Sequence, residues 1–115
     1  MKLRVLLLSL LVAAVGLTII PIAAPQTKAT TVVVTAKEFK FVLSTKTAKA
    51  GAITFKVVNK GKIAHDFKIA GKKTPLIAPG KSATLRVTLT KGPHKYICTV
   101  IGHAAAGMKG TFRAT

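Results

Sequence analysis

The C-terminal stretch "YICTVIGHAAAGMKG" contains three side chains that can bind a soft metal ion. Cys98, the only cysteine of the chain, is followed by His103 and then by Met108, with equal spacing between them. Thiolate, imidazole and thioether donors together favour copper over calcium or magnesium. A lone cysteine in an exported protein needs a role other than an internal disulfide, and metal binding provides one. The spacing therefore predicts a copper site near the end of the chain.

A fourth donor could come from either of the two remaining histidines, His65 and His94. His94 would lie on the same strand as Cys98 and about 13 Å away from it, so we interpret it as a surface residue. His65 follows the turn Asn59-Lys60-Gly61 and is distant in sequence, as expected if a sandwich brings another strand end to the same pole. Two histidines, one cysteine and a weak axial methionine form the blue-copper donor set. The predicted metal ligands are His65, Cys98, His103 and Met108.

Short stretches with a period of two separate the turn signals and predict strands rather than helices. In residues 52–59, for example, Ile53, Phe55 and Val57 alternate with Thr54, Lys56 and Val58. Seven strands are predicted, at residues 31–36, 38–43, 52–59, 63–70, 82–90, 94–100 and 110–114. An eighth strand is expected if residues 45–48 pair with a neighbour. The pattern favours an all-β fold, an antiparallel Greek-key sandwich or barrel of seven to eight strands.

The N-terminal segment has the layout of an export signal. Lys2 and Arg4 precede an apolar run at residues 5–24, which ends in small residues before Pro25. The run is also about 20 residues long, which is enough to span a bilayer. Residues 1–29 are therefore expected to be a signal peptide or an N-terminal membrane anchor, and residues 30–115 the working domain. Either alternative predicts a periplasmic or extracellular location.

The charge of the chain is strongly one-sided. It carries 19 lysines and arginines but only two acids, Glu38 and Asp66, for a formal net charge of +17. Such a field attracts anionic partners and weakens with salt. We find no carboxylate pair for acid–base catalysis, no Ser-His-Asp arrangement and too few histidines for a multicopper oxidase, so no enzymatic activity is expected. The few aromatic residues alternate inward, which argues against specific nucleic-acid binding.

The stretch "YICTVIGHAAAGMKGTF" resembles the C-terminal motif of the cupredoxins, which are small blue copper proteins of the plastocyanin and azurin type. The Cys-x4-His-x4-Met loop is closest in kind to rusticyanin-like members. Upstream, "AKEFKFVLSTKTAKAGAITFKVVNKGKIAHDFKI" resembles the first half of the family, with Asn-x-Gly before the first histidine ligand. The resemblance extends from about Val32 to Arg113. It implies the cupredoxin-like fold, one Cu(I)/Cu(II) ion per chain and the ligand set given above.

The resemblance also implies that His103 faces solvent within an apolar rim and that electrons leave through it. The rim would include Ile101, Ala104, Ala105 and Ala106, with Met108 as an additional candidate. Two positions depart from the family pattern. Ile101 stands where many members have proline, and Asp66 stands where the residue after the first histidine is often asparagine. Thr99 is the expected partner of Asp66, and a carboxylate there should favour Cu(II).

The leading hypothesis is a type 1 copper protein that shuttles single electrons between redox partners outside the cytoplasm. One alternative is an exported copper carrier or buffer with the same ligands but no electron-shuttle role. Another is a basic adhesion module that binds nucleic acid, an anionic polymer or lipid, with the metal site vestigial. For the leading hypothesis, the charge predicts acidic redox partners, such as a cytochrome or an oxidase, and possible contact with an anionic membrane surface. We expect a monomer.

Overall fold

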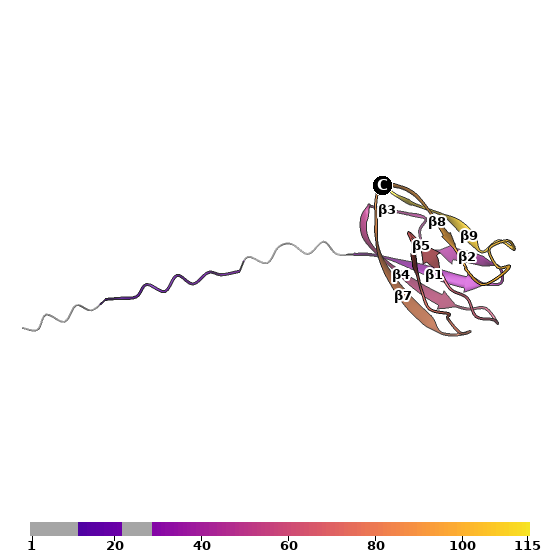
Figure 1. The fold of residues 1–115 in the computed structure, drawn as a ribbon, viewed down its shortest axis with the longest axis horizontal. Coiled ribbons are helices and arrows are strands. Elements are labelled where there is room, and N and C mark those ends of the chain that lie inside the picture. The colour runs from indigo at the N-terminus through magenta and orange to yellow at the C-terminus, as the bar shows by residue number, and fades with distance from the viewer. Residues whose placement is uncertain (1–11, 22–28) are drawn as a thin grey trace, which may run out of the picture.

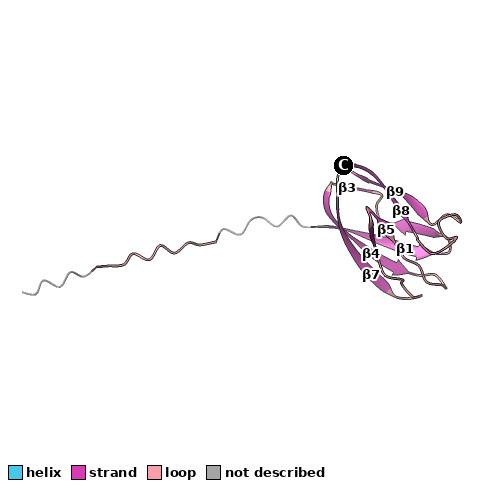
Figure 2. Cartoon of the chain, viewed as in Figure 1, coloured by secondary structure: helices cyan, strands magenta, loops and turns pink. Residues whose placement is uncertain are grey.

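The computed structural model describes residues 12–21 and 29–115, and its regular structure consists of strands (Figures 1 and 2). No helix occurs within these described ranges. The elements in chain order are β1 (Thr30–Lys37), β2 (Lys40–Leu43), β3 (Thr47–Ala48), β4 (Gly51–Asn59), β5 (Lys68–Ile69), β6 (Lys72–Lys73), β7 (Ser82–Leu89), β8 (Gly92–Ile97) and β9 (Lys109–Ala114).

The strands form two sheets, one with the order β2-β1-β4-β7 and the other with the order β3-β9-β8-β5-β6. The predicted all-β sandwich is confirmed, and the sheets do not close into a single barrel. Most pairs are antiparallel as predicted, but β1–β4 and β3–β9 are parallel. Apolar residues alternate in the same way in parallel and in antiparallel strands, so the sequence pattern cannot distinguish the two kinds of pairing. Direction is set instead by the segments that intervene between paired strands.

Three predicted boundaries differ from the structure. β2 begins at Lys40, because Glu38 and Phe39 form the two-residue turn that joins it to β1. The predicted strand at residues 63–70 is reduced to β5 and an isolated bridge between His65 and Ile77. Between them, the backbone N–H of Phe67 donates to Thr74 Oγ1 at 3.1 Å rather than to a strand partner. The eighth strand does pair, as β3, and residues 72–73, which lie outside the predicted strands, form β6.

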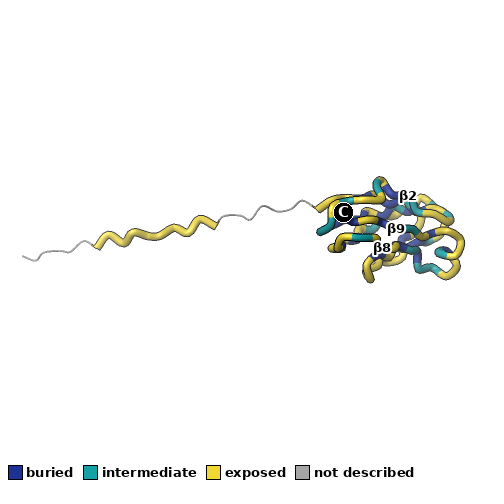
Figure 3. Tube along the Cα trace, turned by 90° about the horizontal axis from the view of Figure 1, so that it is seen from above, coloured by how far each residue is buried: buried dark blue, intermediate teal, exposed yellow. Residues whose placement is uncertain are grey.

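The core lies between the inner faces of the two sheets, which appear as dark blue segments in Figure 3. The predicted inward residues of β4 and β7 are all buried. Aromatic rings from both sheets meet edge-on, tilted or stacked, with centroids 5.2 to 5.9 Å apart. This cluster consists of Phe41, Phe55, Phe67, Tyr96 and Phe112. It fixes the separation of the sheets and hence the positions of the loops at their ends.

The predicted export segment lies mostly outside the described residues. Residues 12–21 have no regular secondary structure and are exposed (Figure 3). Among the residues that the structure describes, we find no helix that is long and apolar enough to cross a membrane. The division into residues 1–29 and 30–115, and the choice between signal peptide and anchor, therefore stay predictions.

Candidate metal centre

Four segments meet at one pole of the sandwich. They are the β1–β2 turn, the loop at residues 60–64 after β4, the end of β8 and the loop between β8 and β9. Potential ligand atoms of His65, Cys98 and His103 lie within 4.8 Å of one another, and all three side chains are buried. The structure thus brings together residues that are up to 38 positions apart in sequence.

The distances within this cluster fit a shared metal ion. His65 Nδ1 lies 3.2 Å from His103 Nδ1, and Cys98 Sγ lies 3.6 Å from the same His103 atom. Nitrogen and sulfur ligands of a tetrahedral zinc ion, taken as a guide, lie about 2.0 and 2.3 Å from the metal. Both observed separations are shorter than the sum of two such bonds, so one ion can contact His103 together with His65 or with Cys98. Imidazole and thiolate are also the donor types that suit copper.

Met108 lies beside the cysteine but contributes no charged donor. Its side chain is fully buried and packs with Cys98 and Ala36 in a small apolar cluster separate from the main core. The structure therefore places all four predicted ligands at one pole. His94 does not join the metal-binding cluster found among the described residues. It lies on β8 opposite Phe112, and its Nε2 is 2.7 Å from the carbonyl oxygen of Thr90.

The loop that carries His103 is held by its own backbone. The N–H of Cys98 donates to the carbonyl of Met108 at 3.0 Å, and the N–H of Met108 donates to the carbonyl of His103 at 3.1 Å. Gly102 and Gly107 have φ angles of 83° and 124°, which glycine adopts without the steric cost of a Cβ. A loop closed in this way limits the movement of its donors.

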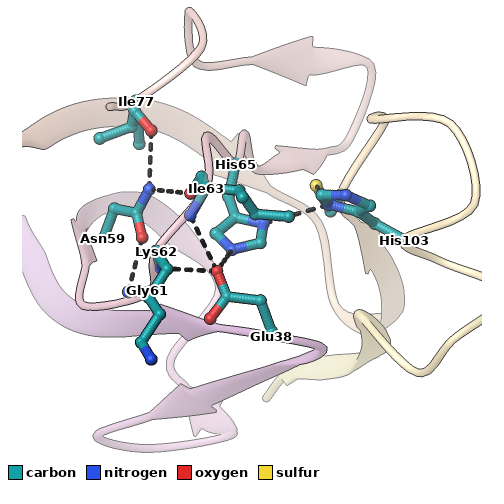
Figure 4. Close-up of polar contacts among 9 residues, drawn as sticks. Glu38, Asn59, Gly61, Lys62, Ile63, His65, Ile77 and His103 are labelled. Atoms are coloured by element: carbon teal, nitrogen blue, oxygen red, sulfur yellow. Dashed lines mark hydrogen bonds and ion pairs between the residues drawn. The ribbon is translucent and has the colours of Figure 1, made fainter. Parts of the chain in front are cut away.

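His65 is positioned by a buried asparagine, which Figure 4 shows beside it. Asn59 Nδ2 donates to the carbonyls of Ile63 and Ile77, each at 2.8 Å, and Asn59 Oδ1 accepts from the N–H of Gly61 at 2.8 Å. The backbone of Ile77 in turn pairs with that of His65 in both directions, at 3.2 and 2.8 Å. Asn59 thus joins the loop at residues 60–64 to the bridge that carries the histidine.

Glu38 is the contact that the sequence analysis missed. Its Oε1 accepts hydrogen bonds from the backbone N–H groups of Lys62 and Ile63, at 2.7 and 3.0 Å, and lies 3.1 Å from His65 Nε2 (Figure 4). A Cβ on Gly61 would lie 2.8 Å from the carboxylate carbon, so the Asn-x-Gly turn leaves room for the acid.

The charge state of Glu38 determines which nitrogen of His65 is free. Backbone donation, from Lys62 above all, lowers the pKa of Glu38 from its ordinary value of 4.5 to about 2. An ionised carboxylate accepts the proton of Nε2–H, which leaves the lone pair of Nδ1 directed toward His103. The hydrogen bond therefore selects the tautomer that can bind a metal ion.

Asp66 contacts the residue that the sequence analysis named as its partner. Its Oδ1 accepts from the N–H of Thr99 at 2.6 Å, and the hydroxyl of Thr99 donates to Oδ2. This pair connects the residue after His65 to the residue after Cys98. It holds the two donor segments together across the end of the sandwich.

Burial raises the pKa of the Cys98 thiol above its ordinary value. A buried thiol with no metal ion bound is therefore protonated at neutral pH. Since the thiolate is the form that binds a metal, binding at this site releases a proton. Affinity for a metal ion at Cys98 consequently increases with pH.

His103 is the more accessible of the two clustered histidines, at 8% exposure against 0% for His65. Ile101 beside it is 98% exposed, and the alanines at 105 and 106 are also exposed. Met108 is fully buried, so it does not belong to the predicted rim. Phe39, predicted to face the core, is instead 40% exposed and packs edge-on against the His103 ring, with centroids 5.0 Å apart. The turn position of Phe39 explains this placement.

Solved structures of blue copper proteins and azurins share the fold. An auracyanin from Roseiflexus castenholzii superposes with a TM-score of 0.67 at 21% identity, over 76% of this chain and 98% of the auracyanin. Auracyanin A from Chloroflexus aurantiacus, a "blue" copper protein, gives 0.64 at 18% identity, over 76% of this chain and 100% of its own. An azurin from Methylomonas sp. strain J gives 0.61 at 16% identity, over 76% of this chain and 99% of its own.

No curated protein sequence matches the chain. The family model described as the cupredoxin-like domain matches residues 8–112, which is most of the sequence. This match agrees with the sandwich and with the cluster of donors at its pole. The chain belongs to the cupredoxin-like domain family.

Proposed function

We propose that this protein is a type 1 copper protein that carries single electrons between redox partners outside the cytoplasm. The observation that supports the proposal is the buried convergence of His65, Cys98 and His103, with Met108 packed beside the cysteine. A copper ion bound by these four side chains would alternate between Cu(II) and Cu(I) and so accept and release one electron. No substrate needs to be transformed for this function.

The protein supplies rigid donors for such an ion. Glu38 and Asn59 fix the position of His65, while the backbone bonds of the loop fix Cys98, His103 and Met108. Ligands that hardly move when the charge of the ion changes keep the reorganisation small, as fast electron exchange requires. The exposed apolar residues around His103 provide a surface through which a partner can approach the centre.

The same burial favours an electron carrier over a copper buffer. A protein that delivers its copper must expose the ligands to a recipient, whereas three of the four side chains here are at most 1% exposed. Release would require opening of the loop between β8 and β9. We therefore expect the copper-loaded protein to retain its copper against mild chelators. Rapid loss of copper would instead favour a role as a copper carrier or buffer.

The decisive experiment is a visible spectrum of the purified protein after addition of Cu(II). The wild-type protein should become intensely blue, because a short thiolate–Cu(II) bond gives type 1 sites their colour. The Cys98→Ser variant should bind Cu(II) without turning blue, since it lacks the thiolate. His94→Ala is the matched control, because His94 lies outside the cluster, and it should remain blue. A colourless wild-type complex, or a blue Cys98→Ser complex, would contradict the proposal.

A further inference from the structure

The outer face of the five-stranded sheet carries a row of like charges. Lys68 on β5 lies directly opposite Lys73 on β6, and on its other side Lys68 faces Ile97 of β8. Ile97 in turn faces Lys109 of β9. Because residues opposite one another in a sheet project from the same face, the three lysines and the isoleucine form one continuous row.

The next residues along these strands extend the same face. Lys95 pairs with Thr111, and Arg113 pairs with Pro93 on one side and Thr47 on the other. All five basic side chains are exposed. We call this set the basic face; it consists of Lys68, Lys73, Lys95, Lys109 and Arg113.

No acid forms a salt bridge with a residue of the basic face. The chain has only two acidic residues, and both are engaged at the metal centre: Glu38 with His65 and the loop after β4, Asp66 with Thr99. Among the described residues, the single close contact between an acidic and a basic side chain is the one between Glu38 and His65. Like charges directly opposite one another destabilise a sheet, so the basic face gains from an external anion.

The opposite side of the sandwich differs. On the outer face of the four-stranded sheet, the pairs that contain a basic residue mostly set it beside a neutral one, as in Thr54–Arg86 and Lys56–Thr84. Lys37 and Lys40 face one another only at the β1–β2 turn. The positive charge is thus denser on one face, which a general role in solubility does not explain.

The basic face also adjoins the metal centre. Ile97 immediately precedes Cys98, and Lys109 immediately follows Met108. A shallow depression of about 460 Å³ lies on this face between Lys95 and Lys109. Lys73 lines a second depression, of about 340 Å³, together with the exposed Leu76 and Ile101. Asp66 also lines it, but this side chain is only 3% exposed and its carboxylate is bonded to Thr99. Lys73 therefore connects the basic face to the apolar rim beside His103.

We propose that the basic face, together with the apolar depression at Leu76 and Ile101, is the docking surface for a redox protein with an acidic surface. The surface suits a protein partner because exposed apolar residues beside the metal loop adjoin a row of unpaired cations, and protein interfaces join an apolar area to a charged rim in this way. The proposal rests on the proposed electron-transfer function and specifies where the partner binds. In the docked complex, one electron leaves the reduced centre and reduces the ferric haem or other acceptor of the partner.

Charge reversal on the two outer faces tests the proposal. Lys68→Glu/Lys73→Glu changes the basic face, and Lys56→Glu/Arg86→Glu makes the same change in net charge on the four-stranded sheet. The probe is succinylated cytochrome c in its ferric form, in which lysines are converted to carboxylates. Stopped-flow spectroscopy at low ionic strength measures its reduction by the copper-loaded, reduced protein. We expect the basic-face variant to be slower by about tenfold or more and the control by about threefold or less. An unchanged visible spectrum in both variants shows that they fold and bind copper.

Equal slowing in the two variants would overturn the proposal, since it would show that only net charge matters. The proposal would also be overturned if the basic-face variant reduced the succinylated cytochrome as fast as the wild-type protein but no longer bound vesicles of anionic phospholipid. That result would assign the face to a membrane. Calorimetric titration with the succinylated cytochrome measures docking without electron transfer. Reduction of the oxidised protein by the small hexaammineruthenium(II) complex tests the redox centre without docking. If the proposed function is wrong, the reduction by hexaammineruthenium(II) will fail. If only the docking surface is wrong, that reduction will proceed, but the calorimetric titration will show no loss of binding in the basic-face variant.

Discussion

Asn59 provides the most direct test of how the fold holds His65. Asn59→Ala removes a fully buried side chain that makes three hydrogen bonds of 2.8 Å, to Gly61, Ile63 and Ile77. These bonds hold the loop at residues 60–64, which supplies the two N–H groups that bind Glu38. The substitution should therefore weaken both the fold and the support of the histidine.

The expected magnitude follows from the groups that lose a partner. Each net hydrogen bond contributes about 1 kcal/mol, so three give about 3 kcal/mol. A further penalty applies only to partners left buried and unpaired. Ile77 O still accepts from the N–H of His65, and Ile63 and Gly61 are at least partly exposed to water. We therefore expect the unfolding free energy to fall by about 3 kcal/mol.

Chemical denaturation of the metal-free protein measures this change, since bound copper would add its own stabilisation. For a domain of this size, the same loss should lower Tm by roughly 12–24 °C. Thr84→Ala is the control, because Thr84 is exposed on β7 and its loss should change the unfolding free energy by less than about 0.5 kcal/mol. If Asn59→Ala is no less stable than this control, the asparagine does not hold the loop as we argue.

Three further predictions concern the carboxylates. Glu38→Gln keeps an acceptor for His65 Nε2 but removes the negative charge, so it should raise the reduction potential in voltammetry; an unchanged or lower value would contradict this reasoning. Because the pKa of Glu38 is lowered in the folded state, its contribution to stability is present above pH 4.5 and is lost as the pH falls toward about 2. Denaturation series at different pH values should therefore show that the unfolding free energy of Glu38→Gln falls less between pH 4.5 and about 2 than that of the wild-type protein. Asp66→Asn should also raise the reduction potential, since a carboxylate near the centre favours Cu(II). A fall, or no change, in the same voltammetry would count against that role.

The sequence identified the donors because their chemistry and spacing are local. Cys98, His103 and Met108 lie within a single loop, and His65 follows a turn that marks the end of a strand. Glu38 was not identified, because a glutamate near the start of a predicted strand has no distinguishing pattern. It lies 27 residues from His65, and only the parallel pairing of β1 with β4 brings the two together. The one available signal was the scarcity of acids in so basic a chain.

The fold was predictable where burial on one face imposed a period of two, as in β4 and β7. The prediction failed where side chains or turns take over backbone partners. Thr74 binds the backbone of Phe67 within the predicted strand at residues 63–70, and the turn at Glu38 and Phe39 shortens β2. Both departures occur in segments that reach the metal centre. Irregular backbone at this pole is what allows donors from separate strands to converge.

The distribution of charge separates two tasks in space. Glu38 and Asp66 lie at the metal centre. Asp66 is buried, so salt only weakly screens its interaction with a bound ion, whereas the Glu38 side chain is 28% exposed. The lysines of the basic face are exposed, so their field acts on an approaching partner and is reduced within about 8 Å at physiological ionic strength. Placing either acid on the outer face would neutralise part of the docking field and also remove a contact that orders the donors. The scarcity of acids is therefore explained by position: the two that the chain has are those that the centre uses.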